Sequence, residues 1–166
     1  MNFLAHFMLA ENTPESRLGN WLGDFVKGLP WDDRFEQAIW QGIMEHRHLD
    51  VFTDSHPAWQ ASRDRLALEN RRYAGIIIDV FYDFFLSKHW AQFSPEQNLD
   101  QFIADIHVDL KAQKSVVPKN TKRVLNAMIR QKWLVNYALI EGVSKTLSRV
   151  ACACLLYTSP SPRDRG

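Results

Sequence analysis

The segment Ala74–Trp90 reads AGIIIDVFYDFFLSKHW and is the most apolar part of the 166-residue chain. Branched aliphatic and aromatic residues surround two carboxylates, Asp79 and Asp83, which stand one helical turn apart. An ionised carboxylate in a dry interior costs several kcal/mol unless it is paired or bound to a metal ion. The segment therefore predicts a core helix whose two acids meet a compensating group from elsewhere in the chain.

The composition is typical of a globular protein with one core. The chain is 46% hydrophobic and 23% charged, and its formal net charge is +1. No apolar run approaches the roughly 20 residues needed to span a bilayer, and the N-terminal MNFLAHFMLAEN lacks the basic start of a secretory signal. We expect one domain in the cytoplasm, with no membrane association. The near-neutral charge gives no indication of nucleic-acid binding.

The C-terminal stretch differs in character from the rest of the chain. CLLYTSPSPRD, residues 154–164, is similar to a conceptual translation of a transposon adapter used in sequencing libraries. We therefore expect the natural domain to cover residues 1–153 and to lack its C-terminal helices, with residues 154–166 an artefact tail. A genuine Ser/Pro-rich tail is the alternative.

Helix signals dominate the remaining sequence. Thr13, Pro14 and Glu15 combine an N-cap, a first-turn proline and an acid near the positive end of a helix. No alternating strand pattern bounded by tight-turn residues is present in the sequence. We expect an all-α, single-domain bundle, with helices over about residues 13–28, 32–55, 58–70, 72–92, 94–115, 119–132 and 134–150.

One helical stripe changes from apolar to polar without changing direction. Residues three or four apart follow the order Phe35, Ile39, Ile43, His46, Asp50 and Asp54. Positions four apart lie about 6 Å along a helix axis and about 40° around it. His46 and Asp50 can therefore reach one point in space, with Asp54 near its edge.

Three other apolar segments carry a polar residue in the same way. The candidate set is His6, Asp24, His46, Asp50, Asp79 and Asp83, with Asn2, Asn20 and Asp54 as outer members. Carboxylate and imidazole ligands suit Mn²⁺, Mg²⁺, Fe²⁺ or Zn²⁺. A metal ion would keep the buried acids ionised. The alternative is a hydrogen-bonded network in which Arg47, Arg71 or Arg72 neutralises them.

Four stretches resemble the bacterial acyl carrier protein phosphodiesterase family, in its order and spacing. They are MNFLAHFMLA, GNWLGDFVKG, GIMEHRHLDVFTDSHP and IIIDVFYDFFLSKHW, and weaker similarity covers most of residues 1–150. The resemblance implies an all-α fold related to the HD-domain phosphohydrolases. It also implies hydrolysis of the phosphodiester that joins phosphopantetheine to a serine of acyl carrier protein, with a divalent metal that is usually manganese. The chain departs from the family in carrying Phe84 where relatives commonly have histidine.

These expectations combine into a metal-dependent phosphodiesterase. The expected metal ligands are Asp24, His46, Asp50, Asp79 and Asp83, with Mn²⁺ as the first choice and Mg²⁺ or Fe²⁺ as alternatives. His6 would be a further ligand or a general acid/base, and Arg47 or Lys88 would stabilise charge on the phosphoryl oxygens. The expected partner is holo acyl carrier protein. Two alternatives stay open: a phosphohydrolase acting on nucleotides, and a helical interaction module without catalytic activity.

Overall fold

The computed structural model describes residues 3–28 and 33–148, and all regular secondary structure in these two ranges is helical. The all-α prediction is therefore confirmed. The helices are α1 (Phe3–Leu9), α2 (Pro14–Leu22), α3 (Gln37–Ser55), α4 (Pro57–Asp64), η1 (Leu68–Tyr73), α5 (Ala74–Lys88), α6 (Trp90–Phe93), α7 (Leu99–Ala112), η2 (Gln113–Ser115), α8 (Lys119–Arg130) and α9 (Trp133–Asn136). Residues 140–148 are helical as well. The predicted artefact tail lies outside the described residues.

Side-chain caps define where two of the helices begin. The backbone N–H of Ser16 donates to Thr13 Oγ1 at 3.2 Å, so the predicted start of α2 is confirmed. The helix predicted from residue 94 begins later, at Leu99, because Asn98 Oδ1 accepts the N–H of Gln101 at 2.8 Å. Ser94 lies before the helix, where its hydroxyl donates to Glu96 Oε1 at 2.8 Å.

Other predicted helix bounds are also wrong, and two of them matter for the site. The helix expected to end at Gly28 ends at Leu22, and residues 23–25 form a turn. Gly28 lies further along the loop with φ of 101°, a left-handed conformation that a residue with a side chain rarely adopts. The segment expected to be one helix over residues 72–92 divides at His89 into α5 and α6, with η1 in front of it.

Helices α2 and α3 cross at close range through two glycines. A Cβ atom added to Gly19 would lie 2.3 Å from the carbonyl oxygen of Ile39, and one added to Gly42 would lie 2.6 Å from that of Ser16. Only glycine lets the two backbones approach so closely. This contact sets the position of α3 relative to the turn that follows α2.

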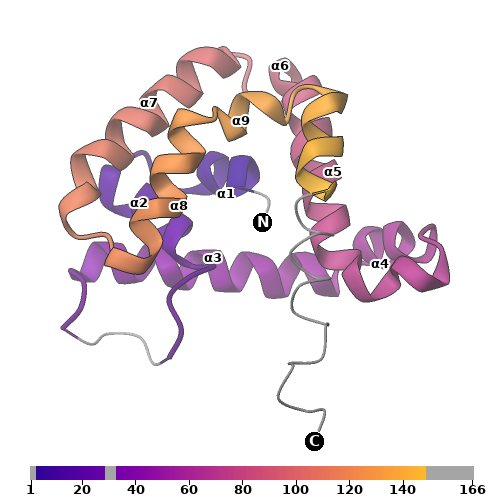
Figure 1. Cartoon of the computed structure of the whole chain (residues 1–166), viewed down its shortest axis with the longest axis horizontal. Coiled ribbons are helices and arrows are strands. Elements are labelled where there is room, and N and C mark those ends of the chain that lie inside the picture. Colours follow the sequence, from indigo (N-terminus) through magenta and orange to yellow (C-terminus); the bar gives the residue numbers. More distant parts are fainter. Residues whose placement is uncertain (1–2, 29–32, 149–166) are drawn as a thin grey trace, which may run out of the picture.

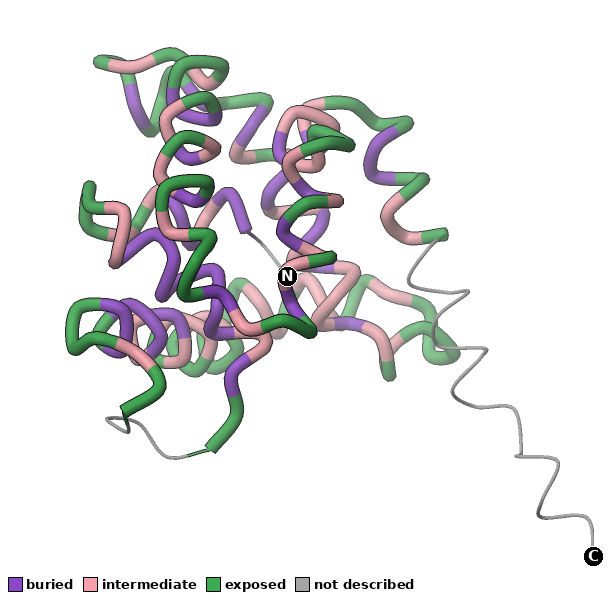
Figure 2. The backbone as a smooth tube through the Cα atoms, turned by 60° about the vertical axis from the view of Figure 1, so that its left-hand side comes forward, coloured by how far each residue is buried: buried purple, intermediate pink, exposed green. Residues whose placement is uncertain are grey.

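The helices surround a core rich in large side chains. Figure 1 shows α3 along one edge of the molecule, with α5 rising from its C-terminal end and α1 between α5 and α2. Buried and exposed stretches alternate along the tube in Figure 2, as expected for helices with one face on a core. Phe3, Trp21, Trp40 and Ile43 are almost completely buried in this core. Among the described residues, no helix is long and apolar enough to cross a membrane.

Candidate metal centre

Helix α3 carries two polar residues of the centre on its inward stripe. Ile39 and Ile43 are buried as predicted, and His46, which continues their stripe, is only 2% exposed. One turn later Asp50 emerges at the edge of the core, and its Oδ2 lies 3.3 Å from His46 Nε2. The predicted convergence of His46 and Asp50 is therefore present in the structure.

Helix α1 brings a second imidazole to the same carboxylate. His6 is 4% exposed, and its Nε2 lies 3.1 Å from Asp50 Oδ1. The rings of His6 and His46 are stacked, with centroids 3.9 Å apart and an interplanar angle of 21°. Both imidazoles thus present Nε2 to one carboxylate, although His6 lies 40 positions before His46 and 44 before Asp50 in the chain.

Asp24 completes the centre from the turn after α2. Its Oδ1 lies 3.6 Å from His46 Nε2, and its Oδ2 is buried without a hydrogen-bond partner among the described residues. A buried carboxylate oxygen without a partner is costly unless another group satisfies it. Asp24 therefore carries an unused ligand atom beside His46.

The ionisable groups strongly perturb one another. Burial lowers the pKa of His46, but the interactions with Asp24 and Asp50 outweigh it and raise this pKa to about 9. Burial raises the pKa of Asp50, but contacts with His46 and His6 hold it well below its usual range. The pKa of Asp24 is likewise lowered, because its interaction with His46 exceeds the effect of burial. In the absence of metal, the centre therefore holds a proton at neutral pH.

The donor set fits a divalent cation. One ligand atom each from His6, His46 and Asp50 lies within 4.8 Å of the others, and Asp24 adds its unused oxygen at the edge. Two imidazole nitrogens and two carboxylates match the preferences of Mn²⁺, Fe²⁺ and Zn²⁺, and the carboxylates also suit Mg²⁺. His6, predicted as a ligand or a general acid/base, is one of the three residues of this group.

The buried carboxylate of Asp83, on α5, contacts backbone amides of α1. It is fully buried, and its Oδ2 and Oδ1 accept the backbone N–H groups of Leu4 and Ala5 at 2.9 and 3.0 Å. These amides belong to the first turn of α1, where N–H groups lack partners within the helix. Backbone amides are thus the groups that contact Asp83 among the described residues, and Asp83 lies outside the group of His6, His46 and Asp50 that could hold a metal ion.

Asp79 lies outside the group of three residues that share the centre. It is half-buried on α5, one turn before Asp83, and its charge raises the pKa values of both Asp83 and Asp54. Asp54, the outer member of the α3 stripe, is exposed. The apolar segment of α5 therefore buries only one of its two carboxylates completely, although Asp79 and Asp83 lie on the same side of the helix.

Arg47 binds the loop that follows Asp24. Its guanidinium donates to the carbonyl oxygens of Val26 at 2.9 Å and of Gly28 at 3.3 Å. It therefore holds the loop that follows Asp24, and none of its hydrogen bonds among the described residues is with His6, His46 or Asp50. Lys88 is exposed, and its Nζ lies 5.9 Å from the ring centroid of Phe84.

Gly23 contacts the candidate centre closely, and the sequence alone did not single it out. A Cβ atom there would lie 2.2 Å from Cγ of His46, so the backbone of the turn presses directly on the imidazole. The ring of His46 is thus held between Gly23 and His6. The signal in the sequence was a glycine directly before Asp24, the candidate ligand.

In comparisons with known proteins, the family profile and several similar proteins carry the same name. The profile of the acyl carrier protein phosphodiesterase family matches residues 1–155. An acyl carrier protein phosphodiesterase of Shigella boydii is 37% identical over 154 residues, which cover 91% of this chain and 78% of the relative. Proteins of the same name from Enterobacter sp. (strain 638) and Escherichia coli O9:H4 are each 36% identical over the same extent. No solved structure matches the chain, so the implied relation to HD-domain phosphohydrolases stays a prediction.

Proposed function

This chain belongs to the acyl carrier protein phosphodiesterase family, and from that premise we propose that it converts holo acyl carrier protein to the apo form. Water adds to phosphorus, and the bond between phosphorus and the serine oxygen breaks. The serine oxygen takes up a proton, and 4′-phosphopantetheine is released. The observation that carries the proposal is the convergence of His6, His46 and Asp50 in a chain of this family.

We propose that His6, His46, Asp24 and Asp50 hold a divalent cation. Mn²⁺ is the first choice, and Mg²⁺ and Fe²⁺ are alternatives. When bound, such a cation supplies Lewis acidity, which polarises a phosphoryl oxygen and lowers the pKa of water. Asp24 offers the unused buried oxygen, and the stacked imidazoles offer their Nε2 atoms.

The side chains of the centre orient one another and store a proton. Asp50 contacts both imidazoles at Nε2, so it fixes the direction in which each ring points. Gly23 removes the freedom of the His46 ring by close contact. Because the pKa of His46 is about 9 without metal, its proton must leave when a cation binds. The centre therefore couples metal uptake to proton release.

The proposed partner is holo acyl carrier protein as a protein substrate, and the proposed compartment is the cytoplasm, where the protein would meet it. The alternative of a helical module without catalytic activity would require arginines to neutralise the buried acids. In the described structure Arg47 binds backbone carbonyls, Arg71 pairs with Asp64, and Arg72 lies over the ring of Tyr73. None of these three arginines is engaged with the centre.

The test is incubation of holo acyl carrier protein with the enzyme and Mn²⁺, followed by mass spectrometry of the carrier protein. We expect its mass to fall by that of the phosphopantetheine group, and EDTA to stop the reaction. His46→Ala should reduce the rate at least about 100-fold. His48→Ala is the matched control, because His48 is an exposed histidine on the same helix, and it should retain activity. Unchanged carrier protein, together with hydrolysis of a nucleotide, would favour a nucleotide phosphohydrolase.

A further inference from the structure

One segment of the chain carries charge of a single sign. Residues 110–140 contain seven basic residues and no Asp or Glu, although the whole chain has a net charge of only +1. The basic residues are Lys111, Lys114, Lys119, Lys122, Arg123, Arg130 and Lys132. The segment includes the end of α7, η2, α8 and α9. Such a segment creates a positive potential on one part of the surface and attracts acidic partners.

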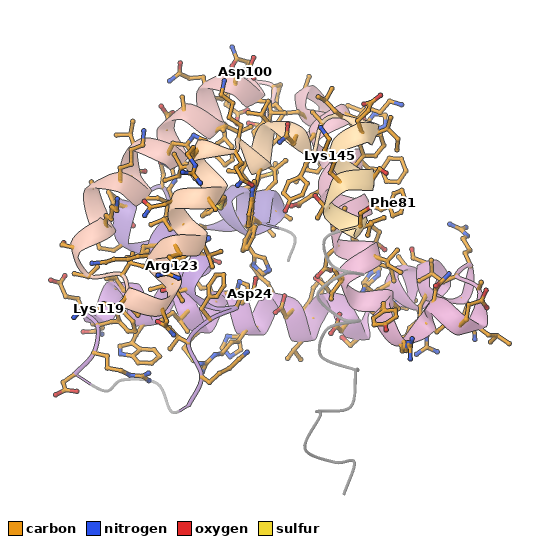
Figure 3. All side chains as sticks on the ribbon, in the orientation of Figure 1. Asp24, Phe81, Asp100, Lys119, Arg123 and Lys145 are labelled. Atoms are coloured by element: carbon orange, nitrogen blue, oxygen red, sulfur yellow. The ribbon has the colours of Figure 1, made fainter. Side chains whose placement is uncertain are left out.

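Helix α8 has one face on the core and exposes basic side chains on the other. It buries Thr121, Leu125 and Met128, and it exposes Lys119 and Arg123 one turn apart at its N-terminal end. Figure 3 shows these two side chains at the end of α8 that lies toward the loop between α2 and α3. In the described part of the chain, neither side chain has an ion pair or a hydrogen bond. Their charges are therefore available to a partner.

A groove of about 400 Å³ joins this end of α8 to the loop that follows Asp24. It combines apolar walls with cationic and polar groups, and its lining residues are Phe25, Val26, Lys27, Arg34, Phe35, Val116, Pro118, Asn120 and Thr121. Lys27 is exposed, and it stands three residues after Asp24, so their Cα atoms are at most about 11 Å apart. A molecule bound in the groove therefore contacts the loop that directly follows Asp24.

The second basic surface of the protein is largely occupied by its own contacts. On α4 and η1, Arg63 and Arg71 contact Asp64, and Arg71 also donates to the carbonyl oxygen of Leu66. Arg72 lies over the ring of Tyr73. The acids near the groove, Asp33 and Glu36, lie on the loop before α3, and α8 carries none. The surplus of positive charge is therefore at the α8 groove.

We propose that this groove, with Lys27, Lys119 and Arg123 at its rim, is the docking surface for an acidic, partly apolar face of the protein substrate. The inference rests on the proposed function, which makes acyl carrier protein the substrate. Docking in the groove places the substrate next to Asp24 and steers association through opposite charge. It explains why basic residues gather at one end of α8 in a chain whose overall charge is nearly neutral.

The test compares two double charge reversals in the full-length protein. Lys119→Glu with Arg123→Glu changes the groove, and Arg65→Glu with Lys145→Glu makes the same change of net charge elsewhere. Figure 3 shows Lys145 well away from Lys119. Binding of labelled holo acyl carrier protein is measured by fluorescence anisotropy in EDTA, where no turnover occurs, at low and high salt. We expect the groove variant to raise Kd on the order of tenfold and to weaken its salt dependence, and the control variant to bind as the wild type does.

Unchanged Mn²⁺ affinity and helical circular dichroism will show that the groove variant is folded. Equal losses in both variants, or no binding of the carrier protein to wild type at low salt, would overturn the docking proposal. It would also be overturned if the groove variant lost affinity only for a DNA duplex. If wild type binds the carrier protein through the groove but does not cleave it with Mn²⁺, the proposed function fails and the docking surface stands.

Discussion

At the scale of single residues, the chemistry of the centre depends on which group balances each buried charge. His46 is balanced by two carboxylates, Asp24 and Asp50, and keeps its proton to a pKa of about 9. Asp83 accepts hydrogen bonds from two backbone amides, which only partly offset the effect of its burial. The first arrangement can exchange its proton for a cation, whereas the second one stabilises α1.

The raised pKa of His46 predicts a strong pH dependence of metal binding. Because one proton must leave Nε2, the apparent affinity for Mn²⁺ should rise up to about tenfold per pH unit from pH 7 to about pH 9 and then level off. Isothermal titration calorimetry in buffers of different ionisation enthalpy will count the released protons. Asp24→Asn should move the levelling point to lower pH, because it removes one of the groups that raise the pKa. An affinity independent of pH in this range contradicts the prediction.

The contact between Gly23 and His46 predicts the effect of adding one methyl group. Gly23→Ala places a Cβ atom within the van der Waals radius of the imidazole, so the ring or the turn has to move. We expect at least about a tenfold loss of Mn²⁺ affinity. Gly75→Ala is the matched control, since a Cβ atom there meets nothing within 4 Å, and it should bind Mn²⁺ as wild type does. Equal affinities for the two variants would show that the close contact is not needed.

At the scale of helices, the centre is built where α1, α3 and the turn after α2 meet. Each supplies one or two of the proposed ligands, and none supplies three. The distance between Asp24 and His46 depends on the crossing of α2 and α3, which the glycine pair at positions 19 and 42 permits. A buried network, in which the Asn20 amide donates to Glu45 and to the carbonyl oxygen of Ser16, adds polar contacts to the same crossing.

The crossing predicts the cost of a side chain at Gly42. A Cβ atom there would lie 2.6 Å from the Ser16 carbonyl oxygen, and both atoms belong to backbone or are bonded to it. Because rigid helices must separate to remove the overlap, Gly42→Ala should lower the free energy of unfolding by about 1–3 kcal/mol. Urea unfolding of wild type and variant measures the difference. Gly75→Ala, in an open position of α5, should not destabilise the protein.

At the scale of the whole molecule, stability should depend on pH through two groups with raised pKa values. Burial raises the pKa of Asp83 to about 7, although the amides of Leu4 and Ala5 partly offset the effect. From about pH 4 to pH 7 the native protein therefore binds a proton at Asp83 that the unfolded chain has lost, so stability falls as pH rises. From about pH 6.5 to pH 9 the proton on His46 acts in the same direction.

We therefore predict that metal-free protein loses stability between pH 4 and pH 9, by at most about 1.4 kcal/mol per pH unit for each group. Thermal melts in EDTA across this range measure the trend. Asp83→Asn should remove the lower part of the slope and leave the upper part, whereas Asp79→Asn should only shorten the lower part, because the charge of Asp79 contributes to the raised pKa of Asp83. Saturating Mn²⁺ should reverse the upper part, because binding displaces the proton from His46. Stability that rises with pH in EDTA would contradict both assignments.

The sequence alone determined the properties that depend on local order. Helical periodicity predicted the all-α class and the inward stripe that leads from Ile39 through Ile43 to His46 and Asp50. The cap at Thr13 is equally local, because a hydroxyl and an amide three residues apart meet whenever a helix begins there. The resemblance of four stretches to one family was confirmed by the comparisons, since family motifs are themselves local strings.

Only the tertiary structure decided which group each buried acid meets. Asp79 and Asp83 look equivalent in the sequence, but only Asp83 is fully buried, because the first turn of α1 packs against it and donates its amides. His6 reaches Asp50 across 44 residues, and Arg47 turns to the loop at Val26 instead of the centre. Spacing along a helix determines which side chains share a face. It does not determine what another helix brings to that face, because the packing of backbones, here at Gly19 and Gly42, decides it.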